Sequence, residues 1–402
     1  MSTVAVVGAG AAGIVAALKA SKKHRVVLLD GNDKCGKKIL LTGNGRCNYW
    51  NSVLGAHMYE TDNIEHLETI LSKDNIEACL DYLEKLGIYP KIKNGYYYPY
   101  SNHAASIREI FQKKIDNSSI EFKTNFKVKD INNRSGEFLL ASDSGKTVKC
   151  DKVIIAAGSK AAPKTGSDGS GYMLAKKTGH SINSVLPSLT GLVSLGKFLK
   201  EWEKIRCDAK VSLFANGSFV KEDTGEIQLT STGISGICTF NISGAAAKCI
   251  ERKEKVMVKI NFMPHLENGF YDWFSKRCEI LSEYTLEEAL ESIFNYKLMF
   301  VFLKIAGVSK DDIWNRLPEN KKQTLCRTIE EFSLDISGTE NFERAQVCTG
   351  GVPLSEINPY TMESNIEKGL YLAGEVLDVD GRCGGYNLAF AFISGYIAGG
   401  CV

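Results

Sequence analysis

The chain has 402 residues, of which 44% are hydrophobic and 24% are charged, and its formal net charge is +2. This length predicts two or three domains, and the composition is that of an ordinary soluble globular protein. No block of like charge indicates a nucleic-acid-binding arm, although nucleic acid is not excluded as a partner. No stretch approaches the roughly 20 apolar residues of a membrane-spanning helix. The 12 cysteines are scattered without a C-x-x-C pair, which favours a reducing, cytoplasmic setting.

The first 30 residues carry the pattern of a nucleotide-binding unit. We expect a strand, a glycine-rich turn, a helix and a second strand over Thr3–Val7, Gly8–Gly13, Ile14–Ala20 and His24–Leu29. Gly8 permits the tight turn, Gly10 lets a diphosphate approach the backbone, and Gly13 lets helix and strand pack closely. The helix N-terminus supplies N–H groups to that diphosphate. Asp30 follows the second strand, where a carboxylate accepts hydrogen bonds from ribose hydroxyls. The motif alone does not separate NAD from FAD.

The next segment, from Gly36 to Asn48, reads G-K-K-I-L-L-T-G-N-G-R-C-N. Arg46 offers a fixed fork of donors for phosphate or a ring carbonyl, and Asn48 offers both a donor and an acceptor. The stretch resembles the G-[KR]-K-[IL]-x-x-[ST]-G-x-G-R-C-N segment of the HI0933-like flavoproteins, also called the BaiN/YhiN type, which lies beside the isoalloxazine. That family often continues with Thr-Asn, where this chain has Tyr49-Trp50-Asn51. The departure leaves flavin binding intact but puts the rim of the pocket in doubt.

The resemblance is strongest near the C-terminus, in Gly369–Asp378 and Gly384–Leu388. Gly374-Glu375 stands where many FAD proteins carry Gly-Asp, whose carboxylate binds the ribitol. Gly385 implies backbone against the flavin, and a helix beginning near Asn387 directs its N-terminus at the pyrimidine carbonyl. The family often has Gln-Trp where Ala389-Phe390 stands, so the surroundings of the site are in doubt but the fold is not.

The motif and the resemblance together imply that FAD is held without a covalent link. Val128 and the turn at Ala157 and Gly158 are assigned by the resemblance to the adenosine half. The residues expected to bind FAD are Gly8, Gly10, Ala11, Ala12, Gly13, Asp30, Lys38, Thr42, Gly43, Gly45, Arg46, Cys47, Asn48, Val128, Ala157, Gly158, Gly374, Glu375, Gly385, Tyr386, Asn387 and Leu388.

The expected fold class is α/β, a Rossmann-type FAD-binding domain of the two-dinucleotide-binding, glutathione reductase type with an inserted β-barrel-like and helical domain. We expect the FAD-binding domain to be discontinuous, over residues 1–188 and 342–402. The insertion divides into a β-rich part, 189–265, and a helical part, 266–341. It is the region least similar to the family, so substrate choice is expected to reside there.

Sequence patterns predict further elements. Ile120–Val128 and Gly136–Ala141 are expected to form a β-meander, and short alternating runs over Val211–Phe240 predict strands in the insertion. Helical periodicity marks Tyr284–Lys304 and Ile313–Phe332.

The expected activity is that of an FAD-dependent oxidoreductase, in which reduced flavin N5 gives hydride to an activated C=C bond. Arg46 and Asn48 are expected to polarise flavin or substrate, and Cys348 is the named candidate for the acid. Other candidate acids are Cys47, Cys383, His103 and His265. Only one G-x-G-x-x-G is present, so NAD(P)H is expected to dock transiently, unless another protein supplies the electrons. No sequence pattern predicts a metal site.

Three alternatives remain open, and a small-molecule substrate is the main expectation. Family members are associated with reduction of uridine in ribosomal RNA, which a basic rim on the insertion would favour. That rim would comprise Lys197, Lys200, Lys204, Arg206 and Lys210. The family is also associated with oxidation of a small aminoketone. A flavin redox sensor without turnover is the third alternative. The sequence specifies no oligomeric state.

Overall fold

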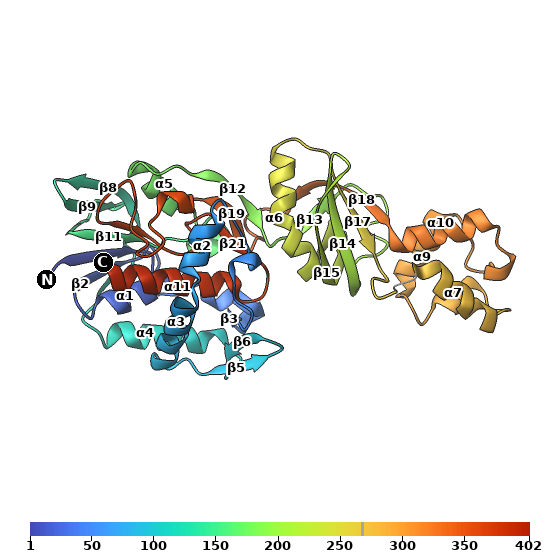
Figure 1. The fold of residues 1–402 in the computed structure, drawn as a ribbon, viewed down its shortest axis with the longest axis horizontal. Coiled ribbons are helices and arrows are strands. Elements are labelled where there is room, and N and C mark those ends of the chain that lie inside the picture. The colour runs from blue at the N-terminus through green and yellow to red at the C-terminus, as the bar shows by residue number, and fades with distance from the viewer. Residues whose placement is uncertain (267–268) are drawn as a thin grey trace. The chain divides into compact units, whose positions relative to one another are not determined.

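The computed structural model describes residues 1–266 and 269–402, which divide into two units. The first unit combines Met1–Pro187 with Phe342–Val402, and the second is Ser188–Asn341 (Figure 1). Among the described residues, no helix is both long enough and apolar enough to span a membrane.

A five-stranded parallel sheet forms the centre of the first unit. Its strands are β1 (Thr3–Val7), β2 (Arg25–Leu29), β7 (Glu121–Lys123), β11 (Lys152–Ile155) and β20 (Leu370–Leu372), in the order β20-β11-β1-β2-β7. Four of the five residues of β1 and of β2 are buried, as expected for strands covered on both faces. Because β20 pairs with β11, the two ends of the chain build one sheet. The predicted α/β fold and the predicted strand, turn, helix and strand are confirmed.

Six helices belong to this unit: α1 (Ala11–Ala20), α2 (Ile64–Ile70), α3 (Lys73–Lys85), α4 (Ala104–Asp116), α5 (Ser170–Lys177) and α11 (Tyr386–Cys401). Helices α1 and α11 lie side by side (Figure 1) and approach each other closely through glycines. A Cβ atom on Gly395 would lie 2.3 Å from the Ala12 carbonyl oxygen, and one on Gly399 would lie 2.3 Å from that of Ala16. The two backbones are therefore in direct contact at both positions.

Four smaller sheets accompany the parallel sheet in this unit, and in three of them the strands pair antiparallel. They comprise β8 (Val128–Arg134), β9 (Glu137–Ser142) and β10 (Thr147–Cys150); β3 (Trp50–Asn51), β6 (Tyr96–Pro99) and β5 (Pro90–Lys93); β4 (Tyr59–Thr61) with β21 (Val379–Gly381); and β12 (Asn183–Ser188) with β19 (Val347–Gly351). The prediction that Ile120–Val128 is one strand of a meander was wrong. A turn with Asn125 at φ 51° divides it, so that β7 joins the parallel sheet and β8 starts the meander.

The second unit contains a closed six-stranded barrel. Its strands, in barrel order, are β13 (Leu192–Ser194), β16 (Gly233–Gly236), β15 (Ser218–Thr230), β14 (Arg206–Ala215), β17 (Val256–Asn261) and β18 (Phe332–Thr339). Helix α6 (Ile237–Glu251) follows β16, so the predicted strand region Val211–Phe240 is corrected at its end. Apolar and polar residues alternate from Cys238 to Ser243, as they would in a strand, but these residues lie in α6, where consecutive residues are buried.

Four helices complete this unit: α7 (Gly269–Ile280), α8 (Leu286–Leu290), α9 (Tyr296–Ala306) and α10 (Glu319–Glu330). The predicted helix Tyr284–Lys304 is thus two helices, and Ile313–Phe332 yields only α10 and a short turn. Phe332 begins strand β18, whose residues alternate between buried and exposed. The ring of Phe332 packs 5.2 Å from Trp202 and 6.1 Å from Phe302, so barrel and helices share one core. The segment assigned to the helical part of the insertion therefore contributes a strand to the barrel.

Candidate FAD site

The glycine-rich turn after β1 leaves the N-terminus of α1 free for a ligand. A Cβ atom on Gly8, at φ 101°, would lie 2.4 Å from the Ala156 carbonyl oxygen, and one on Gly13 would lie 1.8 Å from that of Gly8. Gly10 has no heavy atom within 4 Å of its Cβ position. Helix α1 has no side-chain cap and no acidic residue in its first turn. These N–H groups are therefore suited to bind a phosphate.

A cavity of about 910 Å³, part of it open to solvent, surrounds this turn. Of the residues predicted to bind FAD, the cavity is lined by Gly8, Gly10, Ala11, Ala12, Asp30, Lys38, Thr42, Ala157, Gly158, Gly374, Glu375, Asn387 and Leu388. Segments from both ends of the chain therefore meet in one cavity, and they fit a ligand with a diphosphate.

Asp30 lines both this cavity and a second one beside it. Its carboxylate accepts hydrogen bonds from the backbone N–H groups of Ala9 at 2.6 Å and Asn32 at 2.7 Å. The second cavity is also lined by Val128 and by Lys127, whose ammonium pairs with Asp168. Asp30 and Val128, predicted to serve the adenosine half, thus lie at the same end of the site.

The segment after Lys38 forms a kinked turn, η1 (Lys38–Gly45), in which Gly43 adopts φ 55°. A Cβ atom on Gly43 would lie 2.6 Å from the backbone nitrogen of Asn48, so only glycine fits there. Oriented to donate, the Asn48 amide reaches the carbonyl oxygens of Trp50 and Tyr97, each at 3.1 Å. Asn48 therefore holds this turn against the neighbouring sheet, and its predicted polarising role stays a prediction.

Arg46 is exposed at the end of the same turn. Its Nε donates to the Gly43 carbonyl oxygen at 3.2 Å, and its guanidinium lies 5.2 Å from the centre of the Tyr98 ring. The terminal nitrogens of this guanidinium form no hydrogen bond or ion pair within the described residues, so a ligand can approach them. The predicted residues that line neither cavity are Gly13, Gly43, Gly45, Arg46, Cys47, Asn48, Gly385 and Tyr386.

Glu375 is the most connected carboxylate of the cavity. Its Oε2 accepts from Lys38 Nζ at 2.7 Å, and its Oε1 accepts from Ser159 Oγ at 2.8 Å and from the Cys348 backbone N–H at 3.3 Å. Only 26% of the Lys38 side chain and 18% of the Glu375 side chain are exposed. The site therefore contains a half-buried ion pair at its centre.

The candidate acids lie away from the cavity wall. Cys348 is buried in a small cluster with Ala161 and Ala345, and neither Cys348 nor Cys47 lines the cavity. His103 and His265 are exposed and also lie outside the lining. Burial and, secondarily, Glu375 raise the pKa of the Cys348 thiol to about 11, so this thiol is protonated at neutral pH.

Alkylation with iodoacetamide at pH 8 should therefore modify the exposed Cys401 and spare Cys348 in the folded protein. The thiolate is the reactive form, and burial raises the pKa of both thiols, but the reagent reaches only Cys401, because Cys348 is 2% exposed. Peptide mass spectrometry after timed labelling measures the difference, with guanidinium-unfolded protein as the control. Equal labelling of the two cysteines would contradict the buried position of Cys348.

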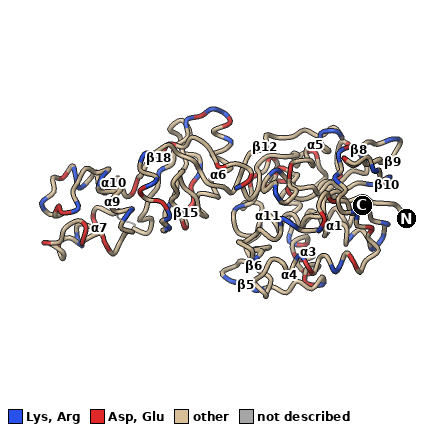
Figure 2. The backbone as a smooth tube through the Cα atoms, turned by 180° about the vertical axis from the view of Figure 1, so that it is seen from behind, with Lys and Arg blue, Asp and Glu red and all other residues tan. Residues whose placement is uncertain are grey.

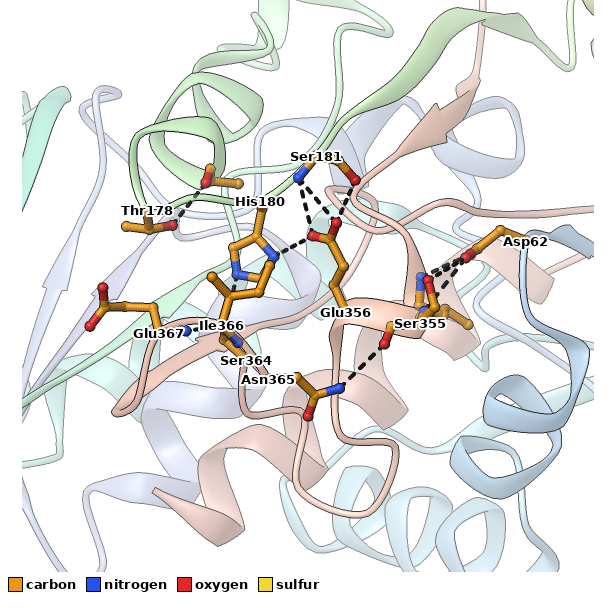
Figure 3. A network of polar contacts seen from close by, with 12 residues as sticks. Asp62, Thr178, His180, Ser181, Ser355, Glu356, Ser364, Asn365, Ile366 and Glu367 are labelled. Atoms are coloured by element: carbon orange, nitrogen blue, oxygen red, sulfur yellow. Dashed lines mark hydrogen bonds and ion pairs between the residues drawn. The ribbon is translucent and has the colours of Figure 1, made fainter.

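A second polar cluster lies outside both cavities (Figure 3). His180 Nδ1 lies 2.8 Å from Glu356 Oε2, and its Nε2 lies 2.9 Å from Ser364 Oγ. The Asp62 carboxylate accepts the backbone N–H of Leu354 at 2.8 Å. It therefore holds, from the other side, the turn that carries Glu356. The order of carboxylate, imidazole and hydroxyl resembles that of a hydrolase triad.

The environment of Ser364 shows that this cluster is structural. Its Oγ accepts the backbone N–H groups of Ile366 at 3.0 Å and Glu367 at 2.8 Å, which occupies its lone pairs. His180 is only 3% exposed, and a substrate has no access to it. The cluster fixes the segment that leads into β20, which explains polar residues in this part of the chain.

Several cavity residues were not among those predicted to bind FAD. They are Ala9, Asn32, Gly36, Lys37, Ile39, Ala156, Thr165, Gly166, Ser167, Gln346, Val347 and Ala391. Ala9 lies in the glycine-rich turn, and Gly36, Lys37 and Ile39 lie in the motif from Gly36 to Asn48, so the sequence indicated their segments. For Ala156, the available indication was its position directly after the buried strand β11. No group of three His, Cys, Asp or Glu residues in the described part of the chain is arranged to hold a metal ion.

The sheet, the glycine-rich turn and the cavity define a Rossmann-type FAD-dependent oxidoreductase. The chain belongs to the HI0933-like family, because the model of the HI0933-like protein Rossmann domain matches residues 2–401. This confirms the predicted family. The chain is 36% identical over 404 residues, 99% of its length and 98% of the relative, to a 3-dehydro-bile acid delta(4,6)-reductase of Clostridium scindens.

Other relatives are more distant. The chain is 28% identical, over 97% of its length and 95% of the relative, to a ribosomal RNA dihydrouridine synthase of Escherichia coli. The open conformation of a flavocytochrome c3 fumarate reductase has a similar fold, with a TM-score of 0.51 and 16% identity over 99% of this chain and 77% of that one. This last similarity concerns the fold alone.

Proposed function

We propose that the protein is an NAD(P)H-driven reductase that saturates an activated C=C bond in a small molecule. The observation that carries the proposal is the similarity, over 99% of the chain, to a protein named as a delta(4,6)-reductase of a bile acid. The cavity that joins both ends of the chain supports it. None of the twelve cysteines, all of which lie in the described part of the chain, forms a disulfide, which agrees with work in a reducing cytoplasm.

FAD, when bound, would supply the two-electron chemistry that reduces the C=C bond. The protein positions it and sets the local electrostatics. Helix α11, of 16 residues, has no acidic residue in its first turn and no side-chain cap, and Asn387 and Leu388 of that turn line the cavity. Its N-terminus therefore stabilises negative charge there. In this proposal Arg46, exposed at the end of η1, contacts the substrate carbonyl, and water supplies the proton, because the Cys348 thiol is buried away from the cavity lining.

Anaerobic reduction of the purified holoprotein by NADPH and by NADH tests the proposal. The reduced protein is then mixed with an enone, with aminoacetone, with oxygen alone and with unmodified ribosomal RNA, and flavin absorbance is followed. We expect rapid reoxidation by the enone. Rapid reoxidation only by another acceptor would replace the proposal with that activity, and failure of all four would favour a redox sensor.

Reduction of uridine in ribosomal RNA is the second candidate, favoured by the relatives named as ribosomal RNA dihydrouridine synthases. The expected basic rim is partly neutralised, because Arg206 pairs with Glu226 at 2.7 Å and Lys210 with Glu222 at 3.6 Å. Acidic and basic segments are interspersed along the barrel (Figure 2). In the same panel, this candidate requires RNA-dependent reoxidation that weakens with added salt.

A further inference from the structure

The ion pair of Lys38 and Glu375 joins segments that are distant in the sequence. Lys38 begins the turn η1, and Glu375 follows β20, 337 residues later. Ser159, after β11, and the backbone of Cys348, in β19, occupy the other carboxylate oxygen. The Glu375 carboxylate is therefore fixed by three donors from three different segments.

This pair lies beside the phosphate-binding end of α1. A Cβ atom on Gly374 would lie 2.8 Å from the Cβ of Ala12, so Glu375 directly follows a residue in contact with the first turn of the helix. Ala12, Lys38 and Glu375 all line the same cavity. A diphosphate at the helix N-terminus is therefore close to both charges.

A diphosphate bound in this cavity needs a positive counter-ion, because the wall of the cavity itself carries carboxylates. Its carboxylates are Asp30 and Glu375, and its ammonium groups are Lys37 and Lys38. The Lys37 ammonium pairs at 2.9 Å with the carboxylate of Asp33, a residue that does not line the cavity. A diphosphate adds about two negative charges, and like charges at contact distance repel strongly where water is limited. Lys38 is the cation that lies beside Glu375.

We propose that Lys38 is the counter-ion shared by Glu375 and the FAD diphosphate, and that Glu375 is a positioning residue that acts through Lys38. Glu375 then holds the ammonium in place instead of binding the ribitol, the role that the resemblance implied. The inference rests on the FAD site of the proposed function but not on the substrate. Lys38 separates two anions that would otherwise repel each other.

Binding of FAD and of ADP to the full chain stripped of flavin tests this proposal. Lys38→Met should weaken both ligands by about ten- to hundredfold, because a charge-assisted bond is lost and Glu375 faces the diphosphate unpaired. The double variant Lys38→Met/Glu375→Gln should recover about tenfold of that loss. ADP carries the diphosphate without the ribitol, so it isolates this contact. Lys34→Met, an exposed lysine of the same segment outside the cavity lining, is the control.

The affinity of the unaltered protein for ADP should fall with added salt, and that of Lys38→Met should fall less. Unchanged ADP binding in Lys38→Met, or a double variant no better than the single one, would overturn the proposal. Circular dichroism and thermal unfolding of each flavin-free variant separate binding from misfolding. Tight FAD binding combined with failure of every acceptor would refute the proposed reductase and leave this inference standing.

Discussion

Replacing Gly10 by alanine should weaken FAD binding by at least about tenfold while leaving the fold intact, a loss of about 1.4 kcal/mol or more. Gly10 has φ −86° and ψ −169°, a conformation that alanine adopts without strain. Its Cβ position has no protein atom within 4 Å, and the residue lines the cavity. The added methyl group therefore occupies space into which a diphosphate must come to reach the α1 N–H groups.

Titration of flavin-free protein with FAD, followed by flavin fluorescence, measures this loss. Gly338→Ala is a matched control, because Gly338 also has free space at its Cβ position and lies in strand β18 of the inserted unit. The control should bind FAD as the unaltered protein does. Wild-type affinity in Gly10→Ala would mean that the diphosphate does not lie against this turn.

The second large effect concerns stability. Gly399→Val should destabilise the FAD-binding unit by about 3 kcal/mol or more. A Cβ atom at this position would lie 2.3 Å from the carbonyl oxygen of Ala16, an atom in the backbone of α1. A helix backbone cannot turn aside as a flexible side chain can, so α1 and α11 must separate.

Gly400→Val is the control for this prediction. It adds the same side chain to the same helix, but the nearest atom is Lys19 Cε at 3.5 Å, in a flexible side chain. Thermal unfolding of both variants, followed by circular dichroism, measures the difference. Equal destabilisation would show that valine in this helix, and not contact between helices, is the cause.

The nucleotide-binding unit could be predicted because its determinants are local. A buried strand, the glycines of the turn and a second strand occur within about 30 residues, and each follows from backbone geometry. The division of Ile120–Val128 could not be predicted, because the choice of partner strand depends on tertiary contacts. Phe332 was assigned to a helix for a similar reason: only pairing with β17 makes it a strand residue.

Within the site, the sequence indicated which residue types gather but not how they pair. The contact between Lys38 and Glu375 spans 337 residues, and no local spacing encodes it. Gln346 and Val347 reach the cavity because β19 begins beside it, which depends on the tertiary fold. Cys348 was a reasonable candidate acid by its position in the motif. Its side chain points into a small buried cluster, which only the structure reveals.

The division of the FAD-binding unit between two distant segments has a consequence for synthesis of the protein. By the time the ribosome has added Thr339, all six barrel strands have been made. Strand β20, the Gly374-Glu375 turn and helix α11 have not yet been made. A chain interrupted there lacks the lining residues Gln346, Val347, Gly374, Glu375, Asn387, Leu388 and Ala391, so we expect it not to retain flavin. Retention of flavin absorbance by a nascent chain would therefore report that translation has passed the inserted unit and that the sheet has gained its edge strand.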